Sequence, residues 1–373
     1  MGLDQKRGAR FIDAGFGYYI ATLFLVYLIP FSPPIVKARP MYKLFKKLCI
    51  FGLFLFLVSV GVFYWLVSTP LALKSEQVEF HIASGSGMRA VAGEIANAGV
   101  VVDPWVLVVL GKVLRVDTSI KAGSYEIVRG TTALGLLKKL TRGDVTQTEI
   151  AFIEGWTFHQ MRERLDAHPD LKHDSKGLPE SEVLRRIGAP ERVAEGLFFP
   201  DTYLFAKRSS DLEVLARAYR VMQKHLAREW AAREPGLPYA NAYQALIMAS
   251  IVEKETGRDR DRPLVAAVFT NRLRQGMLLQ TDPTVIYGMG EAFDGNLRKR
   301  DLQTDTRYNT YVRGGLPPTP IAIPGIASIQ AALHPADSRA VYFVARGDGS
   351  SHFSSTLDEH NQAVNRYQRS GKR

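Results

Sequence analysis

The chain has 373 residues, of which 48 are Lys or Arg and 37 are Asp or Glu, so its formal net charge is +11. A hydrophobic share of 46% and a charged share of 23% exclude a wholly disordered chain, a collagen and a coiled-coil rod, and the single cysteine excludes a disulfide framework and a cysteine-rich zinc module. The length indicates about two or three domains. The positive charge favours an anionic neighbour, such as a membrane surface, nucleic acid or an acidic polymer.

An uncharged apolar run of 21 residues, Leu48–Ser68, is the first strong feature along the chain. A helix needs about 20 apolar residues to cross the hydrocarbon core of a bilayer, and aromatic residues such as Tyr64 and Trp65 favour the headgroup region at its end. Five basic residues and no acidic one lie between residues 37 and 47, directly before the run: Lys37, Arg39, Lys43, Lys46 and Lys47. Because positive charge favours the cytoplasmic side, we expect a cytoplasmic segment 1–47, a transmembrane helix 48–68 and an exported remainder.

Alternatives to this topology remain open. A cleaved signal peptide is one, although the run exceeds the roughly 7–15 residues of a signal core and no small-residue cleavage site follows it. An earlier apolar run, Ala14–Val36, contains three prolines. If translation starts at Met41, this run is absent from the protein. The alternative is that it forms an extra membrane span. The intact mass of the native protein separates these two cases, because a species that starts before Met41 excludes the internal start.

Residues 77–145 are predicted to form a small α+β unit. Their hydrophobic pattern changes between strand and helix periodicity, with Gly-rich turns between the segments. The expected elements are a strand over Gln77–Ile82, helices over Met88–Ala98 and Pro104–Leu114, a strand over Gly123–Ile127 and a helix over Ala133–Leu140.

Residues 146–373 are predicted to be mainly helical, with few strands, which indicates the α+β class for the whole chain. The expected elements are a strand over Thr148–Ile153, helices over Phe158–Ala167, Leu212–Arg233, Asn241–Thr256 and Pro263–Gln275, a strand pair Ala340–Ala345 and His352–Ser354, and a final helix over Leu357–Gln368. Between Leu278 and Pro324 the chain is rich in Gly, Pro, Asn, Thr and Tyr. Long loops of this kind are usually functional, so we expect site residues there.

The segment 245–257 carries the strongest candidate for acid–base chemistry. One stripe of its predicted helix is apolar until it reaches an acid: Ile247, Met248, Ile251, Val252 and Glu255. Burial and the negative end of a helix dipole both raise the pKa of a carboxyl group, and an acid that stays protonated near neutral pH can act as a general acid. The alternative is that Glu255 only emerges at a helix end and pairs with Lys254 or Arg258.

Long runs in this half resemble the endolytic murein transglycosylases of the YceG-like family. The runs are IVEKETG, NRLRQGMLLQTDPTVIYGMG, TRYNTYVRGGLPPTPIAIPG and ALHPADSRAVYFVARGDGSSHFSS, with GLFFPDTY and AGSYEI as shorter matches. The resemblance covers about residues 77–370. It implies a single-pass enzyme of the cell inner membrane, with a LysM-like domain at 77–145 and a lysozyme-like catalytic domain at 146–373, both in the periplasm. Its substrate would be the glycan strands of peptidoglycan.

The resemblance also implies roles for single residues. Lytic transglycosylases carry a Glu-Ser pair at the end of an apolar helix, which Glu255-Thr256 resembles, whereas Glu253 is followed by Lys and does not match. Gly276–Gln280 is similar to their Gly-Leu-Met-Gln segment and Tyr308-Asn309 to their Tyr-Asn segment. We therefore expect Glu255 to be catalytic. The candidates for the sugar subsites are Gln280, Asp282, Tyr287, Tyr308, Asn309 and Tyr311, with loop packing or a turn as the alternative.

A lytic transglycosylase, as the resemblance implies, needs one carboxylic acid. Glu255 would protonate the oxygen between N-acetylmuramic acid and N-acetylglucosamine, then take a proton from the muramic C6 hydroxyl, which attacks C1 and leaves a 1,6-anhydro end. A muramidase that uses water is one alternative, and it requires a second carboxylate such as Asp282. A non-catalytic glycan-binding scaffold for peptidoglycan synthases is another, and it predicts that Glu255→Gln leaves function in cells intact.

The remaining patterns indicate no further chemistry. The eight histidines include no HExxH and are spaced irregularly, so we expect neither a metal site nor a cofactor. No motif for nucleic-acid binding is present. The expected partners are therefore peptidoglycan glycan strands, the inner membrane and the peptidoglycan synthases.

Overall fold

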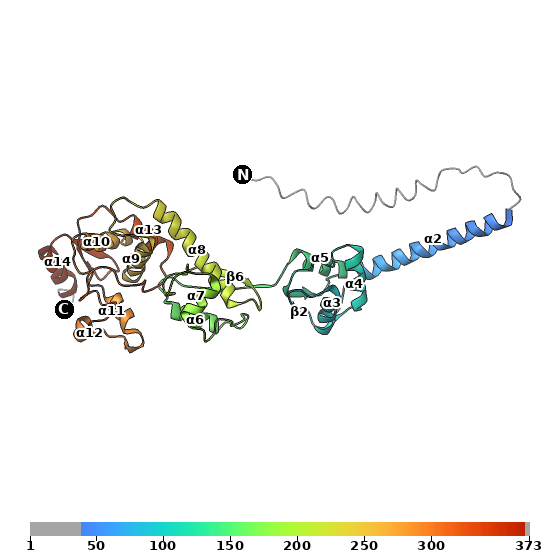
Figure 1. Cartoon of the computed structure of the whole chain (residues 1–373), viewed down its shortest axis with the longest axis horizontal. Helices are drawn as coiled ribbons and strands as arrows, with labels where there is room; N and C mark the ends of the chain where they lie inside the picture. Colours follow the sequence, from blue (N-terminus) through green and yellow to red (C-terminus); the bar gives the residue numbers. More distant parts are fainter. Residues whose placement is uncertain (1–38, 370–373) are drawn as a thin grey trace. The chain divides into compact units, whose positions relative to one another are not determined.

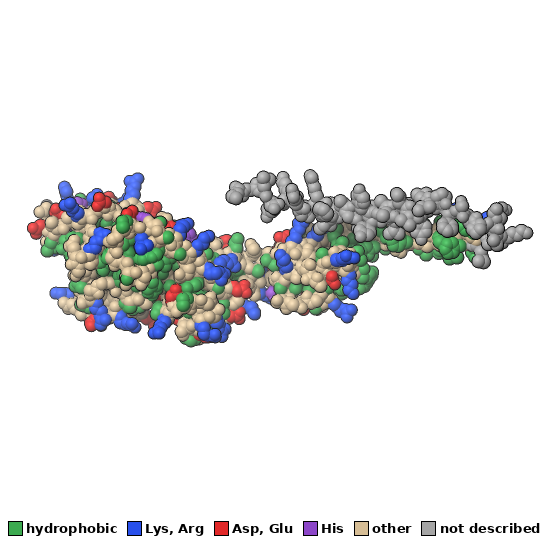
Figure 2. All heavy atoms as spheres, turned by 45° about the horizontal axis from the view of Figure 1, so that its top comes forward, with side chains coloured by type: hydrophobic (Ala, Val, Ile, Leu, Met, Phe, Trp, Pro, Cys, Tyr) green, Lys and Arg blue, Asp and Glu red, His purple; other side chains and the backbone are tan. Residues whose placement is uncertain are grey.

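The computed structural model describes residues 39–369, so the apolar run at 14–36 and residues 1–38 lie outside it. Its first element is helix α2 (Arg39–Ser68), of which Tyr42–Ser68 is long and apolar enough to cross a membrane, with a mean hydropathy of 2.4. Large apolar side chains are exposed along it, and appear in green in Figure 2 where other atoms do not cover them. The helix begins before the predicted Leu48 because the basic residues ahead of the apolar run are also good helix formers.

The chain divides into a unit up to Leu66 and a second unit from Val67 onward. The second unit starts with a small α+β region, in which Figure 1 labels β2, α3, α4 and α5. They are β1 (Ala72–Leu73), β2 (Gln77–Ile82), α3 (Met88–Asn97), β3 (Val100–Val101), α4 (Pro104–Val113), β4 (Gly123–Val128) and α5 (Ala133–Arg142). All five elements predicted for this region are present.

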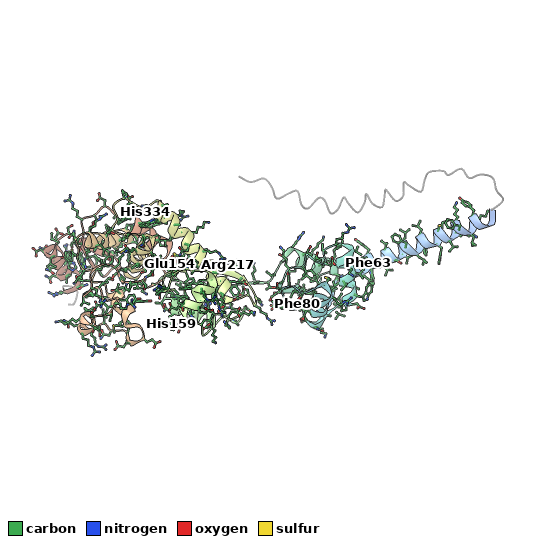
Figure 3. All side chains as sticks on the ribbon, in the orientation of Figure 1. Phe63, Phe80, Glu154, His159, Arg217 and His334 are labelled. Atoms are coloured by element: carbon green, nitrogen blue, oxygen red, sulfur yellow. The ribbon has the colours of Figure 1, made fainter. Side chains whose placement is uncertain are left out.

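Two antiparallel strand pairs organise the small region. β2 pairs with β4 so that Phe80 lies opposite Tyr125, and their rings stack with centroids 5.9 Å apart (Figure 3 labels Phe80). β1 pairs with β3. Helix α5 is capped at its start by the Thr132 side chain and ends at Gly143, which takes a left-handed φ of 75°. These caps explain why a short helix with only four buried residues has sharp ends.

The rest of the second unit is mainly helical, as predicted (Figure 1). Its helices are α6 (Phe158–Asp166), α7 (Glu180–Ile187), α8 (Asp211–Ala231), α9 (Ala242–Glu255), α10 (Arg262–Arg274), α11 (Asp282–Met289), α12 (Lys299–Gln303), α13 (Ile326–Leu333) and α14 (Leu357–Val364), with 3-10 turn η1 (Gly290–Ala292) and π-helical turn η2 (Asn365–Arg369). Helix α9 packs against α8, α10, α11 and α13, so it is the central helix of this region.

Two strand pairs complete this region. The hairpin of β7 (Tyr342–Ala345) with β8 (Ser351–Ser354) confirms the predicted strand pair. Strand β5 (Gln147–Ala151) was predicted, but its antiparallel partner β6 (Thr202–Ala206) was not. β6 begins with the last two residues of the GLFFPDTY run, directly after Pro200 and Asp201, which are both residue types that are rare in strands.

The prediction of one long loop between Leu278 and Pro324 was wrong in part. Two helices, α11 and α12, lie inside it. A turn was the structural alternative for Asp282-Pro283, but the pair opens α11, because a proline in the first turn of a helix loses no hydrogen bond that the helix needs. The remainder of the segment is irregular yet largely buried from Thr319 to Gly325.

Candidate active site

Glu255 is the last residue of α9, and the helix brings it to the edge of the core. The Asn241 side chain caps the start of α9 by accepting a hydrogen bond from the Gln244 backbone N–H. Residues 245–252 are all buried, so the helix is enclosed on every side rather than along one stripe. At Thr256 the backbone turns to an extended conformation and the helix stops. The half-buried Glu255 side chain therefore leaves the core where the chain changes direction.

The Glu255 carboxyl group lies in a setting that favours its protonated form. Thr281 donates a hydrogen bond from its hydroxyl to Oε1 of Glu255. Burial is the main cause that raises the pKa of Glu255, and the nearby Asp282 carboxylate raises it further. The Thr281 hydrogen bond and the Arg272 guanidinium act in the opposite direction without reversing the shift. The direction agrees with the expectation from the sequence.

Arg272 supports this region through the backbone rather than through an ion pair. Its guanidinium donates hydrogen bonds to the carbonyl oxygens of Val341 at 2.7 Å, Leu278 at 3.2 Å and Leu279 at 2.8 Å. The side chain is buried, and burial lowers the pKa of Arg272. Three bonds from one cation fix the chain that leads into Gln280 and Thr281, beside Glu255.

Replacing Arg272 by Met is expected to lower the free energy of unfolding by about 3 kcal/mol or more, because hydrogen bonds to charged groups contribute roughly 1.5–3 kcal/mol each. Arg274→Met is the matched control, since Arg274 is exposed and donates to one carbonyl oxygen, that of Gly236 at 3.1 Å. We expect the control to change stability by less than about 1 kcal/mol. Urea unfolding of the full chain in mild detergent measures both, and equal losses would contradict the assigned role of Arg272.

Glu253, the other acid of the segment, is held differently. Its side chain is 7% exposed, with Oε2 accepting the Gly325 backbone N–H at 3.0 Å and Oε1 lying 3.8 Å from the buried Arg262 guanidinium. Glu154 (labelled in Figure 3) also lies against Gly325, so closely that a Cβ there would collide with its carboxylate. Glu253 thus has a cation and a backbone donor as partners, whereas the described partner of Glu255 is a neutral hydroxyl. Partners, and not burial alone, distinguish the two acids.

A cluster of buried threonines joins α11 to the loop that follows it. Thr281, Thr284 and Thr310 are each at most 2% exposed. The Thr310 hydroxyl accepts the Thr281 N–H at 3.1 Å and lies 2.9 Å from the Thr284 hydroxyl. Gln280, just before them, has a φ of 51° and an exposed side chain. This conformation is unusual for a residue with a side chain, and strained residues of this kind often occur at functional sites.

Asp282 and Tyr311 form a pair next to Glu255. The Tyr311 hydroxyl donates to Oδ1 of Asp282 at 2.5 Å. Asp282 is exposed, whereas Tyr311 is half-buried. Burial raises the pKa of the Tyr311 hydroxyl, and its hydrogen bond to Asp282 raises it further. Four candidates from the sequence, Glu255, Gln280, Asp282 and Tyr311, therefore lie at the N-terminal end of α11.

Tyr287 and Tyr308 form a second group, near the other end of α11. Their rings meet edge to face with centroids 4.8 Å apart. The Tyr308 hydroxyl lies 2.9 Å from the Thr319 hydroxyl, and the Tyr287 hydroxyl donates to Oε2 of Glu195 at 3.1 Å. A Cβ at Gly288 would lie 3.1 Å from Cβ of Tyr308, so α11 and this loop pack closely.

Glu195 was missed by the sequence analysis. It is 4% exposed, and its carboxylate also accepts the Phe158 backbone N–H at 3.1 and 3.2 Å. Burial raises the pKa of Glu195 to about 7. An acid directly before the apolar run GLFF was the only available signal, and it does not reveal that Tyr287, far along the chain, becomes its partner.

Asn309 holds the loop rather than facing solvent. Its side chain is fully buried. The amide nitrogen donates to the carbonyl oxygens of Asp301 at 3.2 Å, Leu302 at 3.1 Å and Thr304 at 2.7 Å, and the amide oxygen accepts the Tyr311 N–H at 2.9 Å. These bonds occupy the Asn309 amide in holding the loop that carries Tyr308 and Tyr311.

One group of described residues has the composition of a metal site. Potential ligand atoms of Asp166, His173 and Asp211 lie within 4.8 Å of one another. The Asp211 carboxylate, however, is already bound to Ser175, whose N–H and hydroxyl donate to it at distances of 2.6 to 3.2 Å. Among the described residues, Oδ1 of Asp166 and Nδ1 of His173 are buried atoms without a hydrogen-bond partner, although both side chains are partly exposed. No metal site was expected here from the sequence.

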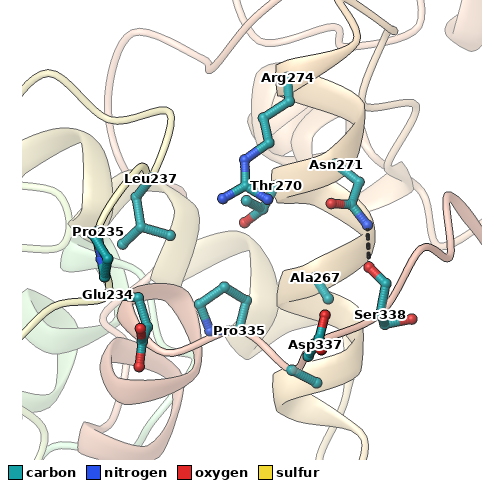
Figure 4. Close-up of a pocket in the computed structure, with 11 residues that line it drawn as sticks. Glu234, Pro235, Leu237, Ala267, Thr270, Asn271, Arg274, Pro335, Asp337 and Ser338 are labelled. Carbon is teal, nitrogen blue, oxygen red and sulfur yellow. Dashed lines mark hydrogen bonds between the residues drawn. The ribbon is translucent and has the colours of Figure 1, made fainter.

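A hollow of about 440 Å³, shown in Figure 4, lies beside α10 but does not belong to the site. Thr270, Asn271 and Arg274 line it, and Asn271 donates to the Ser338 carbonyl oxygen at 2.7 Å. Residues two apart on a helix point in nearly opposite directions, at about 200°. Arg272, which acts on Glu255, therefore lies on the other side of α10 from Thr270 and Arg274.

Comparisons with known proteins agree on one family. The model of the YceG-like family matches residues 80–366. An endolytic murein transglycosylase of Bacillus subtilis is 33% identical over 310 residues, which cover 78% of this chain and 84% of the relative. One from Streptococcus pneumoniae is 25% identical over 354 residues, which cover 84% of this chain and 64% of the relative. A solved YceG-like protein of Listeria monocytogenes is 30% identical, with a TM-score of 0.49. The match covers 77% of this chain and 98% of the Listeria chain. The family match over most of its length means that the chain belongs to the YceG-like family.

Proposed function

We propose that the protein is an endolytic lytic transglycosylase. It cleaves the β-1,4 bond between N-acetylmuramic acid and N-acetylglucosamine in nascent peptidoglycan strands and leaves 1,6-anhydromuramic ends. Relatives from two organisms are named endolytic murein transglycosylases. The observation that carries the proposal is Glu255, a carboxyl group with a raised pKa and a hydroxyl partner at the end of the central helix.

Glu255 carries both proton transfers. In its protonated form it donates a proton to the glycosidic oxygen as the bond from that oxygen to C1 breaks. The resulting carboxylate takes the proton of the C6 hydroxyl while O6 bonds to C1, so the acid is regenerated and no water is consumed. Thr281 orients the carboxyl group by its hydrogen bond. The exposed Asp282 carboxylate and the Tyr311 oxygen supply negative electrostatic potential near the oxocarbenium-like carbon.

A water-using muramidase is the second candidate, and one observation favours it. Asp282 is exposed and close enough to Glu255 to raise its pKa. Two nearby carboxyl groups are the usual equipment of a glycosidase. Against this assignment, Asp282 is already bound by the Tyr311 hydroxyl, which suits a supporting role better than that of a base that activates water.

The helix Tyr42–Ser68 serves in this proposal as a single-pass anchor in the inner membrane, with a cytoplasmic N-terminal side. The chain from about residue 70 onward then lies in the periplasm, where peptidoglycan is made. The region 77–145 is assigned as a LysM-like domain that positions the enzyme on glycan, and residues 146–373 as a lysozyme-like catalytic domain. Peptidoglycan synthases are the protein partners that this location favours.

The products of glycan digestion test the reaction. We expect the full chain in detergent to release fragments from uncross-linked glycan that are lighter than hydrolysis products by one water molecule, as mass spectrometry can resolve. Asp282→Asn should keep this product, and Glu255→Gln should release almost none. Hydrated fragments that disappear with Asp282→Asn would replace the proposal by the muramidase. Absence of cleavage by the folded wild-type chain, alone and in bilayers, would leave only the scaffold.

A further inference from the structure

Helix α4 is apolar on both of its faces. The side that packs into the small region consists of Val106, Leu107, Leu110 and Gly111, all buried. Its opposite side is exposed but equally apolar, with Trp105 at 53%, Val109 at 37% and Val113 at 57% exposure. Val101 at 61% and Leu114 at 39% extend it at either end. We call these five residues the α4 face.

An exposed apolar helix face of this kind normally has a partner. A surface helix of a soluble domain carries polar residues on its outer side, whereas a helix that is apolar all round is covered by something. Helix α5 in the same region follows the usual pattern: its buried residues, such as Leu136 and Leu137, alternate with the outward Lys138. The α4 face is therefore a particular property of α4 and not of the whole region.

The register of the first strand pair places the start of the α4 face near the end of α2. Ala72 pairs with Val101. Ala72 is four residues from Ser68, so the Cα atoms of Ala72 and Ser68 are at most about 14 Å apart. Because β1 and β3 are antiparallel, the chain that leaves Val101 toward Trp105 runs back toward Ser68.

Local contacts secure this arrangement. Val67, in the last turn of α2, is 5% exposed. The Leu71 N–H donates to the Thr131 carbonyl oxygen at 2.8 Å, and Pro70 forms an isolated bridge with Thr132. Residues 67–71, at the start of the second unit, are therefore held against the small region.

We propose that the α4 face lies on the bilayer surface at which α2 ends, with Trp105 at the level of the lipid headgroups. The proposal rests on the anchoring role given to α2 above. Trp favours the membrane interface, and short helices with an apolar face bind there. Lys112 and Arg115 are exposed at the far end of the helix, where they meet anionic headgroups, while the exposed Asp103 precedes it. The contact orients the small region on the membrane.

Nitroxide labels on the full chain test this contact in nanodiscs of phosphatidylethanolamine and phosphatidylglycerol. The only native cysteine, Cys49, lies in α2 and reports on the anchor. In a Cys49→Ser background, Val109→Cys and Val113→Cys place the label on the α4 face. Lys138→Cys is the matched control, because it is exposed on the polar side of α5 in the same region.

Collisions with oxygen, which concentrates in lipid, are compared with collisions with a water-soluble nickel chelate. We expect the oxygen-to-nickel ratio at positions 109 and 113 to exceed that at position 138 severalfold and to approach that at Cys49. A water-like ratio at 109 and 113 beside a lipid-like ratio at Cys49 would overturn the inference and leave the anchor. Low collision rates with both reagents at 109 and 113 would also overturn it, because they indicate cover by protein. A water-like ratio at Cys49 would remove the anchor and the inference together.

Discussion

Glu255→Gln is expected to reduce the rate of glycan cleavage by about 10²–10⁴-fold while the fold persists, because a general acid contributes that much to a proton-transfer step. Gln has nearly the size of Glu, and its amide oxygen can accept the hydrogen bond that Thr281 now donates. The affinity for glycan should change little. Initial rates of strand cleavage, together with thermal unfolding of the full chain, measure both effects, and a variant with wild-type rates would exclude Glu255 as the acid.

Thr281→Val is the matched control for the role of Glu255, because it alters the environment of the carboxyl group and leaves the group in place. The Thr281 hydrogen bond lowers the pKa of Glu255, so its removal should raise that pKa. Glu255 then stays protonated to higher pH, and the fall of kcat/KM on the alkaline side should shift upward in pH. An unchanged pH profile, with activity retained, would mean that another group donates the proton.

The helices of the catalytic region could be predicted well because their signals are local. Helix α9, expected over Asn241–Thr256, runs over Ala242–Glu255 between an Asn cap and a residue with extended backbone. Helix α10 begins with a proline in its first turn and ends close to Gly276. Caps, Pro and Gly act within one turn of a helix, so they need no knowledge of the tertiary structure.

Two failures in the fold depend on a distant partner and on the meaning of one dipeptide. Strand β6 exists because β5, about fifty residues earlier, supplies its hydrogen bonds. Helix α11 begins at an Asp-Pro pair, which is equally common in turns. The buried Thr310 hydroxyl selects the helix, because its contacts with Thr281 and Thr284 hold the first turn in place.

The site shows the same limit. Glu255 could be identified from the pattern of α9 and the family resemblance, but the argument from one apolar stripe could not separate it from Glu253, since both acids are shielded from solvent in part. The partners separate them: Arg262 and a backbone N–H for Glu253, and Thr281 for Glu255. All of these partners except Arg262 lie more than twenty residues away along the chain.

Helix α11 links two of the acids with raised pKa values, Glu255 and Glu195. Thr281, which directly precedes the helix, is bound to Glu255, and Tyr287 within the helix is bound to Glu195. A change at Glu195 therefore acts on the same helix that orients the catalytic candidate. For this reason Glu195 is expected to influence stability directly and activity only through the position of α11.

The stability of the full chain is expected to fall by roughly 3 kcal/mol as the pH rises from about 4.5 to 7, through Glu195 alone. Burial raises its pKa from 4.5 to about 7 in the folded protein. Between these values the folded chain holds a proton that the unfolded chain has lost, so the free energy of unfolding decreases with increasing pH. Glu195→Gln cannot titrate, and urea unfolding at several pH values should show that this variant lacks that part of the decrease.

Tyr287→Phe is the matched control: it removes the hydrogen bond that lowers the pKa of Glu195, so the decrease in stability should extend to higher pH. Identical pH dependence of wild type and Glu195→Gln would show that Glu195 does not take up a proton on folding.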